Sequence, residues 1–214
     1  MLKALMPSLN ELINADYKVI KTAESEQVIN KLLFGVYPVA HPELWQVSGI
    51  PGAGKSTYCA THQMPNFLYI SFDKIMLMLE GYQKMLQKEG AVAAFQHYEM
   101  EARIIGYELL RRAVNKKLNI MLEHSGTNSA HLELFKNLPK KGYKTKINAI
   151  VCDTGLAINR AKERAKQINR HVPEALILER AAKFKDYMNA YQQMATPIAF
   201  LDGANNFAVL KKFK

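Results

Sequence analysis

The chain has 214 residues, enough for one compact domain with a buried core, and its 49% hydrophobic and 22% charged residues exclude a disordered or fibrous protein. A formal net charge of +10 indicates a surface that attracts anions such as nucleotides or nucleic acids, although a solvated basic surface without a specific partner gives the same charge. Two cysteines are too few for a disulfide framework, and the lack of a signal-peptide pattern or a run of ~20 apolar residues predicts a cytoplasmic protein that does not enter a membrane.

Residues 1–40 are predicted to form a helical segment ahead of the main domain, which we expect to span residues 41–214. Ser8 and Glu11 have the spacing of a capping box, the pair of side chains that starts a helix. Apolar residues recur at helical spacing between residues 28 and 33. A glycine and a proline then end this pattern, so we expect these helices to stop before the first strand.

Five apolar, strand-like runs follow, and the segments between them are long enough for helices. The clearest of these helical segments is Ala91–Leu118. Strands that alternate with helices predict a parallel sheet with right-handed crossovers, and hence a three-layer αβα fold around a central, mostly parallel sheet. The predicted strands are Leu44–Val47, Phe67–Phe72, Asn119–Leu122, Lys146–Val151 and Pro197–Leu201.

The first predicted strand leads directly into a phosphate-binding loop. Residues 49–56 read GIPGAGKS, which has every fixed residue of the Walker A pattern between a strand and a helix. The backbone N–H groups of such a loop surround the phosphates, Lys55 neutralises the β and γ oxygens, and Ser56 can ligate Mg²⁺. The sequence therefore predicts a site for ATP and Mg²⁺, whose nucleotide contacts are expected from Gly49, Ile50, Pro51, Gly52, Ala53, Gly54, Lys55, Ser56 and Thr57.

Other short motifs narrow the class of P-loop protein. A GTPase should carry Asp-x-x-Gly after a strand and Asn-Lys-x-Asp at the base site, and neither is present. Motor and AAA-type ATPases usually have a strand that ends in Asp-Glu, whereas residues 120–123 read IMLE. A small kinase is therefore the favoured class, with residues 41–214 as its P-loop kinase domain.

Polar residues that follow the strands are candidates for catalysis, because ligands of open parallel sheets lie beyond the carboxyl ends of the strands. Asp73 comes directly after the second strand, where a base can accept the proton of an attacking hydroxyl. The alternative is that Asp73 is only a helix N-cap. Glu123, Ser125 and Thr127 follow the third strand and could bind the substrate or a Mg²⁺-bound water; the alternative is loop capping, and His124 between them is expected to be structural.

A basic segment follows the fourth strand. Arg160 and Arg164 are one helical turn apart, Arg170 follows, and lysines lie between them. Arginines of this kind suit a lid that closes over phosphates and stabilises the charge of a phosphoryl group in transfer. The alternative is a solvated helix face with a basic bias.

These residues together resemble the zeta toxin family of P-loop kinases, which is related to polynucleotide-kinase-like phosphotransferases. The resemblance runs from about Leu44 to Asp202, beyond the first 40 residues. It depends on the phosphate loop, on the segments 70–73, 119–127 and 141–144, and on Arg164 followed by residues 170–173, which read RHVP.

The resemblance implies an ATP-dependent kinase that phosphorylates a hydroxyl of a small phosphate-bearing acceptor, typically the nucleotide sugar UDP-N-acetylglucosamine. It implies that Asp73 is the catalytic aspartate, that Arg164 and Arg170 contact phosphate, and that Glu123 and Ser125 contact the substrate. We add Lys55 to the catalytic set, and Thr127 and Arg160 to the substrate contacts. The resemblance also implies a small helical antitoxin protein as partner.

The sequence departs from the family pattern near the acceptor. Ser71 stands where many relatives have a second aspartate, and Met76 stands where Arg or Lys is common. Either Glu101 or Glu108 could match a substrate-binding glutamate. The acceptor therefore stays open, and two other functions compete: a kinase of nucleic-acid 5′-hydroxyls, which the net charge permits, and a non-catalytic regulator that binds ATP.

Overall fold

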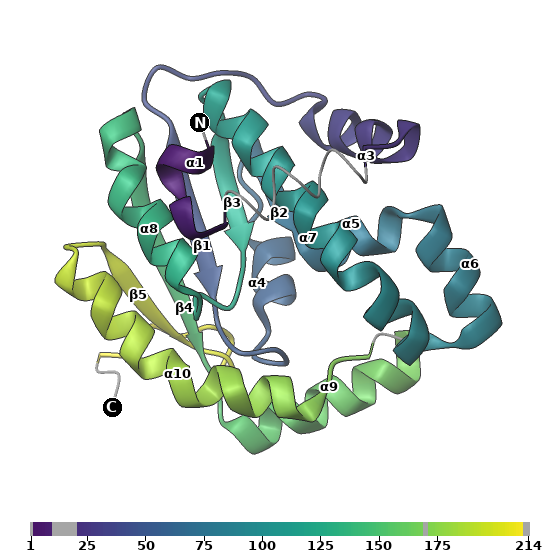
Figure 1. Ribbon diagram of the computed structural model, residues 1–214. Helices are drawn as coiled ribbons and strands as arrows, with labels where there is room; N and C mark the ends of the chain where they lie inside the picture. Colours follow the sequence, from purple (N-terminus) through teal and green to yellow (C-terminus); the bar gives the residue numbers. More distant parts are fainter. Residues whose placement is uncertain (1, 10–20, 169–170, 212–214) are drawn as a thin grey trace.

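The computed structural model describes residues 2–9, 21–168 and 171–211 (Figure 1). Five strands form one parallel sheet in the order β2-β3-β1-β4-β5. The predicted parallel sheet is confirmed, and each predicted strand lies within two residues of an observed one. The strands are β1 (Glu43–Ser48), β2 (Phe67–Ser71), β3 (Asn119–Glu123), β4 (Lys144–Val151) and β5 (Ile198–Asp202).

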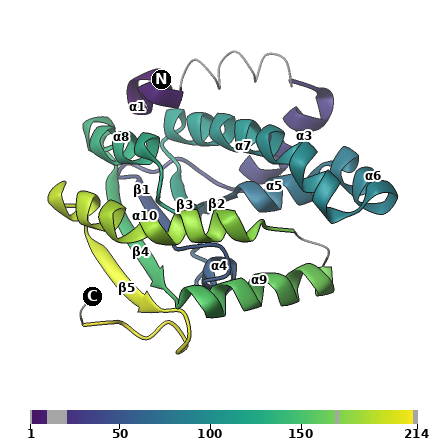
Figure 2. The same cartoon turned by 60° about the horizontal axis from the view of Figure 1, so that its bottom comes forward.

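Helices cover both faces of this sheet, as the predicted three-layer fold requires. Figure 2 shows α7 and α8 on one side of the strands and α4 on the other. The inner strands are covered on both faces, so even the polar Gln46 of β1 and Asn148 of β4 are buried. The helical elements are α1 (Leu2–Leu5), α3 (Ala23–Leu33), α4 (Lys55–Thr61), α5 (Phe72–Met78), α6 (Glu80–Glu89), α7 (Ala91–Asn115), α8 (Ser129–Asn137), the 3₁₀ turn η1 (Pro139–Lys141), α9 (Thr154–Ile168) and α10 (Glu174–Gln193).

The strand register brings the polar segments of the sequence together. Val47 of β1 and Ser71 of β2 both pair with Glu123 at the end of β3. On the other side of β1, Ser48 pairs with Ala149 of β4. The phosphate loop, the start of α5 and the loop after β3 therefore begin at one level on the carboxyl edge of the sheet.

The N-terminal segment contacts α8 and α7, two helices on the same side of the sheet. The predicted capping box at Ser8 and Glu11 includes a residue outside the described part of the chain. Ser8 itself donates two hydrogen bonds, from its backbone N–H and its hydroxyl, to Glu133 of α8 at 3.1 and 2.8 Å. A different capping box starts α3: the Ser25 N–H donates to Thr22 Oγ1 at 3.1 Å, and the Thr22 N–H donates to Ser25 Oγ at 3.0 Å.

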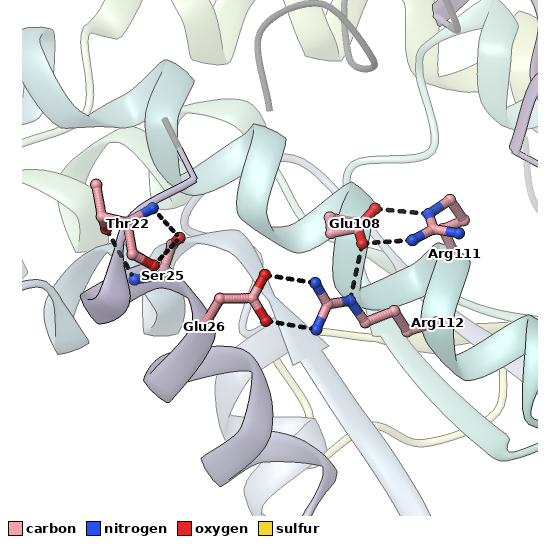
Figure 3. Close-up of polar contacts among 6 residues, drawn as sticks. All are labelled: Thr22, Ser25, Glu26, Glu108, Arg111 and Arg112. Atoms are coloured by element: carbon pink, nitrogen blue, oxygen red, sulfur yellow. Dashed lines mark hydrogen bonds and ion pairs between the residues drawn. The ribbon is translucent and has the colours of Figure 1, made fainter. Parts of the chain in front are cut away.

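A cluster of ion pairs attaches α3 to α7 (Figure 3). Arg112 of α7 donates from both terminal nitrogens to the Glu26 carboxylate of α3, each at 2.7 Å. Its Nε donates at 2.8 Å to Glu108, which also accepts two bonds from Arg111 at 2.6 Å. Burial raises the pKa of Glu108, but the hydrogen bonds from the two arginines outweigh burial and hold that pKa below its ordinary value.

Arg112→Met is expected to lower the free energy of unfolding by about 2 kcal/mol, because it leaves Glu26 and the buried Glu108 short of donors. Since the folded-state pKa of Glu108 is lowered, its contribution is present above the ordinary value of 4.5 and is lost as the pH falls through the folded value. Denaturant unfolding at pH 7 and below pH 4 measures both effects. The control is Lys84→Met, since the pair of Lys84 with Glu80 is 78% exposed at both side chains and should matter little. Equal stability of the two variants at pH 7 would contradict the prediction.

Candidate active site

A cavity of about 510 Å³ opens at the carboxyl edge of the sheet. Its wall combines the phosphate loop with segments that are far apart in sequence: the start of α5, the middle of α7, the loop after β3, helices α9 and α10, and the loop after β5. The phosphate loop, Asp73, Glu123 and Ser125, which follow different strands in the sequence, are therefore neighbours in space.

The phosphate loop lies against α9, and glycine makes this approach possible. At Gly52, φ is +87° and an added Cβ atom would lie 2.1 Å from the carbonyl oxygen of Ala157. The Lys55 ammonium donates to the carbonyl oxygens of Gly49 and Ile50 at 2.9 and 3.0 Å, which holds it inside the curve of the loop. The loop residues in the cavity wall are Pro51, Gly52, Gly54, Lys55, Ser56 and Thr57, whereas the remaining predicted contacts, Gly49, Ile50 and Ala53, do not line it.

Glu123 connects the phosphate loop to the neighbouring strands. Its Oε1 accepts a hydrogen bond from the Ser56 hydroxyl at 2.7 Å, and its Oε2 accepts one from the Tyr69 hydroxyl of β2. The side chain is 6% exposed, yet it lines the cavity. A hydroxyl and a carboxylate side by side are the hard oxygen donors that Mg²⁺ prefers.

These donors fit Mg²⁺ as it binds beside a nucleotide. Within the described ranges, no group of three or more His, Cys, Asp or Glu side chains could form a protein cage for a metal ion. Mg²⁺ is usually held by one or two protein oxygens together with phosphate oxygens and water. Ser56 and Glu123 supply these oxygens at the mouth of the phosphate loop.

Arg164 of α9 lines the cavity, and two nitrogens of its guanidinium make no hydrogen bond with the described residues. Its Nε and NH2 nitrogens are buried and have no hydrogen-bond acceptor in the described part of the chain. Burial lowers the pKa of this group, although the charge of Glu123 opposes the shift, and an arginine remains protonated regardless. A buried cation with unused donors is costly, so the arrangement is suited to an anion that enters the cavity.

Asp73 lies in the first turn of α5 and lines the cavity. The N-cap of α5 is Ser71, whose hydroxyl accepts a hydrogen bond from the Lys74 N–H at 3.5 Å. The alternative interpretation of Asp73 as the helix N-cap is therefore wrong. Ser71 therefore caps α5, while Asp73 is one of the residues that line the cavity.

The loop after β3 is more deeply buried than the sequence suggested. Ser125 lines the cavity, but Thr127 is 2% exposed and is not part of the wall. The backbone oxygen and the hydroxyl of Thr127 both accept hydrogen bonds at 3.2 Å from Arg180 of α10. The structure therefore brings Ser125 to the cavity and leaves Thr127 beneath it.

His124 packs face to face with His131, with ring centroids 3.6 Å apart. The His124 Nδ1 accepts a hydrogen bond from the Gly126 N–H at 3.0 Å. Burial holds the pKa of His124 well below its ordinary range and lowers the pKa of His131 to about 3. His131 is fully buried, whereas His124 is partly exposed and lines the cavity, so the structural role expected for His124 stays a prediction.

Arg160 of α9 lines the cavity and contacts the loop after β5. Its NH1 donates to the carbonyl oxygen of Gly203 at 2.9 Å, in the loop after β5. Phe207 of the same loop packs edge-on against Tyr58, and its ring would lie 3.3 Å from a Cβ atom at Gly54. The structure thus groups Arg160 with residues beside the phosphate loop rather than with Asp73 and Ser125.

Comparison with models of known protein families shows to which family the chain belongs. A family model described as zeta toxin matches residues 30–205. The chain belongs to the zeta toxin family. No match was found among curated protein sequences. The family match begins within α3, so the expectation that residues 1–40 lie outside the resemblance is wrong for residues 30–40.

Solved structures share the fold of this zeta toxin family member at low sequence identity. A chain of the PezAT chromosomal toxin–antitoxin system of Streptococcus pneumoniae is similar with a TM-score of 0.71 and 16% identity, over 87% of this chain and 78% of that one. A chain of the AvrRxo1-ORF1:-ORF2 structure with ATP gives a TM-score of 0.61 and 9% identity, over 95% and 66%. Such identities show the fold alone, while membership of the zeta toxin family supports ATP-dependent phosphoryl transfer.

Some wall residues of this family member were not predicted from the sequence. Glu99 and Arg103 of α7 line the cavity and form an ion pair at 2.6 Å, and Arg180 of α10 lines it beside them. Neither Glu101 nor Glu108 is in the wall. A charged pair four residues apart on a long helix carries no motif, so only the packing of α7 reveals that this pair faces the site.

Arg170 lies outside the described residues, so its role in the zeta toxin family pattern stays a prediction. Across the described ranges, every helix is too short or too polar to cross a membrane.

Proposed function

We propose that the protein transfers the γ-phosphate of ATP to a hydroxyl of a small, phosphate-bearing acceptor. The observation that carries this proposal is the buried guanidinium of Arg164, which has unused donors inside a cavity that also holds a complete phosphate loop. Transfer of a phosphoryl group needs positive charge where the γ-phosphate moves, and a preorganised arginine supplies it without reorganisation.

The phosphate loop defines the ATP end of the cavity. In this proposal the loop amides and Lys55 bind the phosphates, and the base lies between Arg160 and Phe207, which both line the cavity beside the loop. Mg²⁺, held by Ser56 with Glu123 close by, would neutralise charge on the β and γ oxygens when bound. Arg164 and, by the family pattern, Arg170 would contact the transferred phosphate.

The acceptor end is the part of the cavity formed by α5, α7 and α10. Asp73 is proposed to accept the proton of the attacking hydroxyl, and Glu123 and Ser125 to help orient the acceptor. Arg180 adds positive charge to this wall, Arg103 pairs there with Glu99, and the other members include several apolar side chains, which suits an acceptor with a ring and an anionic group. The apolar members of this wall are Phe72, Met76, Phe95, Ala102, Val172 and Leu176.

A nucleotide sugar such as UDP-N-acetylglucosamine has both features and is the acceptor implied by the family. We propose it as the first compound to test. A cytoplasmic location, where ATP and nucleotide sugars occur together, fits this reaction. A small helical antitoxin as partner is proposed because the similar PezAT structure is described as a toxin–antitoxin system.

The test is incubation of the protein with labelled ATP and a metabolite extract, followed by mass spectrometry of the products, with UDP-N-acetylglucosamine alone in a parallel reaction. We expect a phosphorylated small molecule with the wild type. Lys55→Ala should abolish its formation and weaken ATP binding while the melting temperature stays within a few degrees, since about 1 kcal/mol of hydrogen bonding is lost. Transfer only to 5′-hydroxyl oligonucleotides would favour the nucleic-acid kinase, and ATP binding without transfer to any acceptor would favour the non-catalytic regulator.

A further inference from the structure

Tyr69 lies directly beneath the candidate site without reaching the cavity. It is in β2, two residues before Ser71, and pairs with Met121 of β3 as Ser71 pairs with Glu123. Side chains two residues apart on a strand point to the same face, so Tyr69 and Glu123 share the face of the sheet that α4 covers. The tyrosine and Ser56 contact different oxygens of the same carboxylate.

The Glu123 carboxylate is held by a donor on each oxygen. Tyr69 donates to Oε2, and Ser56 donates to Oε1 at 2.7 Å. A carboxylate with one free oxygen can rotate about its last bond, whereas a carboxylate bound at both oxygens keeps one orientation. Ser56 is the residue that the Walker A pattern assigns to Mg²⁺.

The Tyr69 side chain is itself well fixed in position and in protonation. Its ring lies under the Lys74 ammonium, 5.3 Å from the ring centroid. Burial, followed by the negative charge of Glu123, raises the pKa of the Tyr69 phenol above its ordinary value. In this contact the hydroxyl is the donor and the carboxylate is the acceptor.

We propose that Tyr69 is a positioning residue, whose hydroxyl fixes the Glu123 carboxylate so that its other oxygen faces Ser56 and the Mg²⁺ that accompanies ATP. This inference rests on the proposed function, because it assigns Tyr69 a task only where a metal–nucleotide complex binds. Outer groups that orient the oxygens around a metal typically contribute 10- to 100-fold to metal affinity. Without the hydroxyl, the carboxylate must be ordered each time the metal binds.

The test is Tyr69→Phe, which removes one oxygen atom and keeps the ring. Isothermal titration of Mg²⁺ into the protein with a non-hydrolysable ATP analogue should show about 10- to 100-fold weaker metal binding. Affinity for the analogue in the absence of metal should stay unchanged. In turnover assays the half-saturating Mg²⁺ concentration should rise by a similar factor, while kcat at saturating Mg²⁺ changes only a few-fold.

Tyr143→Phe is the matched control. Its hydroxyl is also buried and donates to the carbonyl oxygen of Leu118 at 2.9 Å, at the start of β3 and away from the cavity. We expect this variant to lose stability as Tyr69→Phe does and to keep the wild-type Mg²⁺ affinity. In a Glu123→Gln background, Tyr69→Phe should weaken Mg²⁺ binding by less than about a further threefold, since the effects of two residues that act through one contact are not additive.

The outcomes separate this inference from the proposed function. If the wild type binds the analogue with Mg²⁺ and Tyr69→Phe binds Mg²⁺ equally well, the tyrosine only packs and the positioning role is overturned. An undiminished effect of Tyr69→Phe in the Glu123→Gln background would overturn it too, because the tyrosine would then act by another route. If the wild type itself shows no Mg²⁺-dependent binding of the analogue, the proposed function fails first and the positioning role fails with it.

Discussion

Replacing Arg164 by methionine is expected to lower turnover by about 10²- to 10³-fold while the affinity for ATP falls less than tenfold. The reason is the timing of the contact: the guanidinium stabilises charge that is greatest when the phosphoryl group is in transfer, so its loss affects the transition state more than the bound nucleotide. Steady-state kinetics together with equilibrium binding of ATP measure the two effects separately.

The same substitution should leave the free protein as stable as the wild type or more stable by about 1 kcal/mol, because methionine removes a desolvated cation that lacks acceptors. Thermal unfolding without nucleotide checks this expectation. Lys162→Met is the matched control on the same helix, since Lys162 is 60% exposed and pairs with Glu174 on the surface. It should change neither turnover nor stability appreciably.

Two results would remove the proposed role of Arg164. Equal losses of ATP affinity and of turnover would indicate that Arg164 only binds the nucleotide. If neither quantity falls, Arg164 takes no part in binding or transfer, as the alternative of a basic helix face holds. Arg164→Lys distinguishes charge from geometry, since a lysine restores the charge without the planar fork and should recover only part of the rate.

The sheet and the phosphate loop could be predicted because their signals are local. An apolar run that enters GIPGAGKS specifies a strand, a turn with positive φ at its glycines and a helix, all within about 20 residues. The order of the polar segments beyond each strand follows from the parallel topology alone. The cap of α5 was not predicted from the sequence: Ser71 caps the helix, whereas Asp73 was the residue considered as a cap. Serine and aspartate are both good N-caps, and the sequence does not show at which of them the strand ends and the helix begins.

The acceptor wall could not be predicted because tertiary packing determines which helix faces reach it. Glu108 was a candidate contact, yet Arg111 and Arg112 bind its carboxylate on the side of α7 that faces α3. Glu99 and Arg103, earlier on the same helix, face the cavity instead. Which side of a 25-residue helix meets a ligand depends on the elements that pack against it, and the sequence pattern around these charges is similar on both sides.

Asp73→Asn is expected to lower phosphoryl transfer by about 10²- to 10⁴-fold while the affinity for ATP holds within a few-fold. Asparagine keeps the shape of the side chain and a hydrogen-bonding oxygen, but it cannot accept the proton of the attacking hydroxyl. Stability should barely change, since Asp73 does not cap α5. Turnover, ATP affinity and melting temperature of the variant test the three statements together.

Ser71→Ala is the control that separates capping from catalysis at the start of α5. Ser71 accepts the hydrogen bond of the Lys74 N–H, so its alanine variant should lose about 1 kcal/mol of stability, as loss of an N-cap does. Its turnover should fall much less than that of Asp73→Asn, because Asp73 stays in the first turn of the same helix. The two variants should therefore have opposite effects. Ser71→Ala should lower stability and largely keep turnover, whereas Asp73→Asn should lower turnover and largely keep stability. A fully active Asp73→Asn variant would show that another group takes the proton, and a proton acceptor would then have to be sought among Glu99 and Glu123, the other carboxylates of the cavity wall.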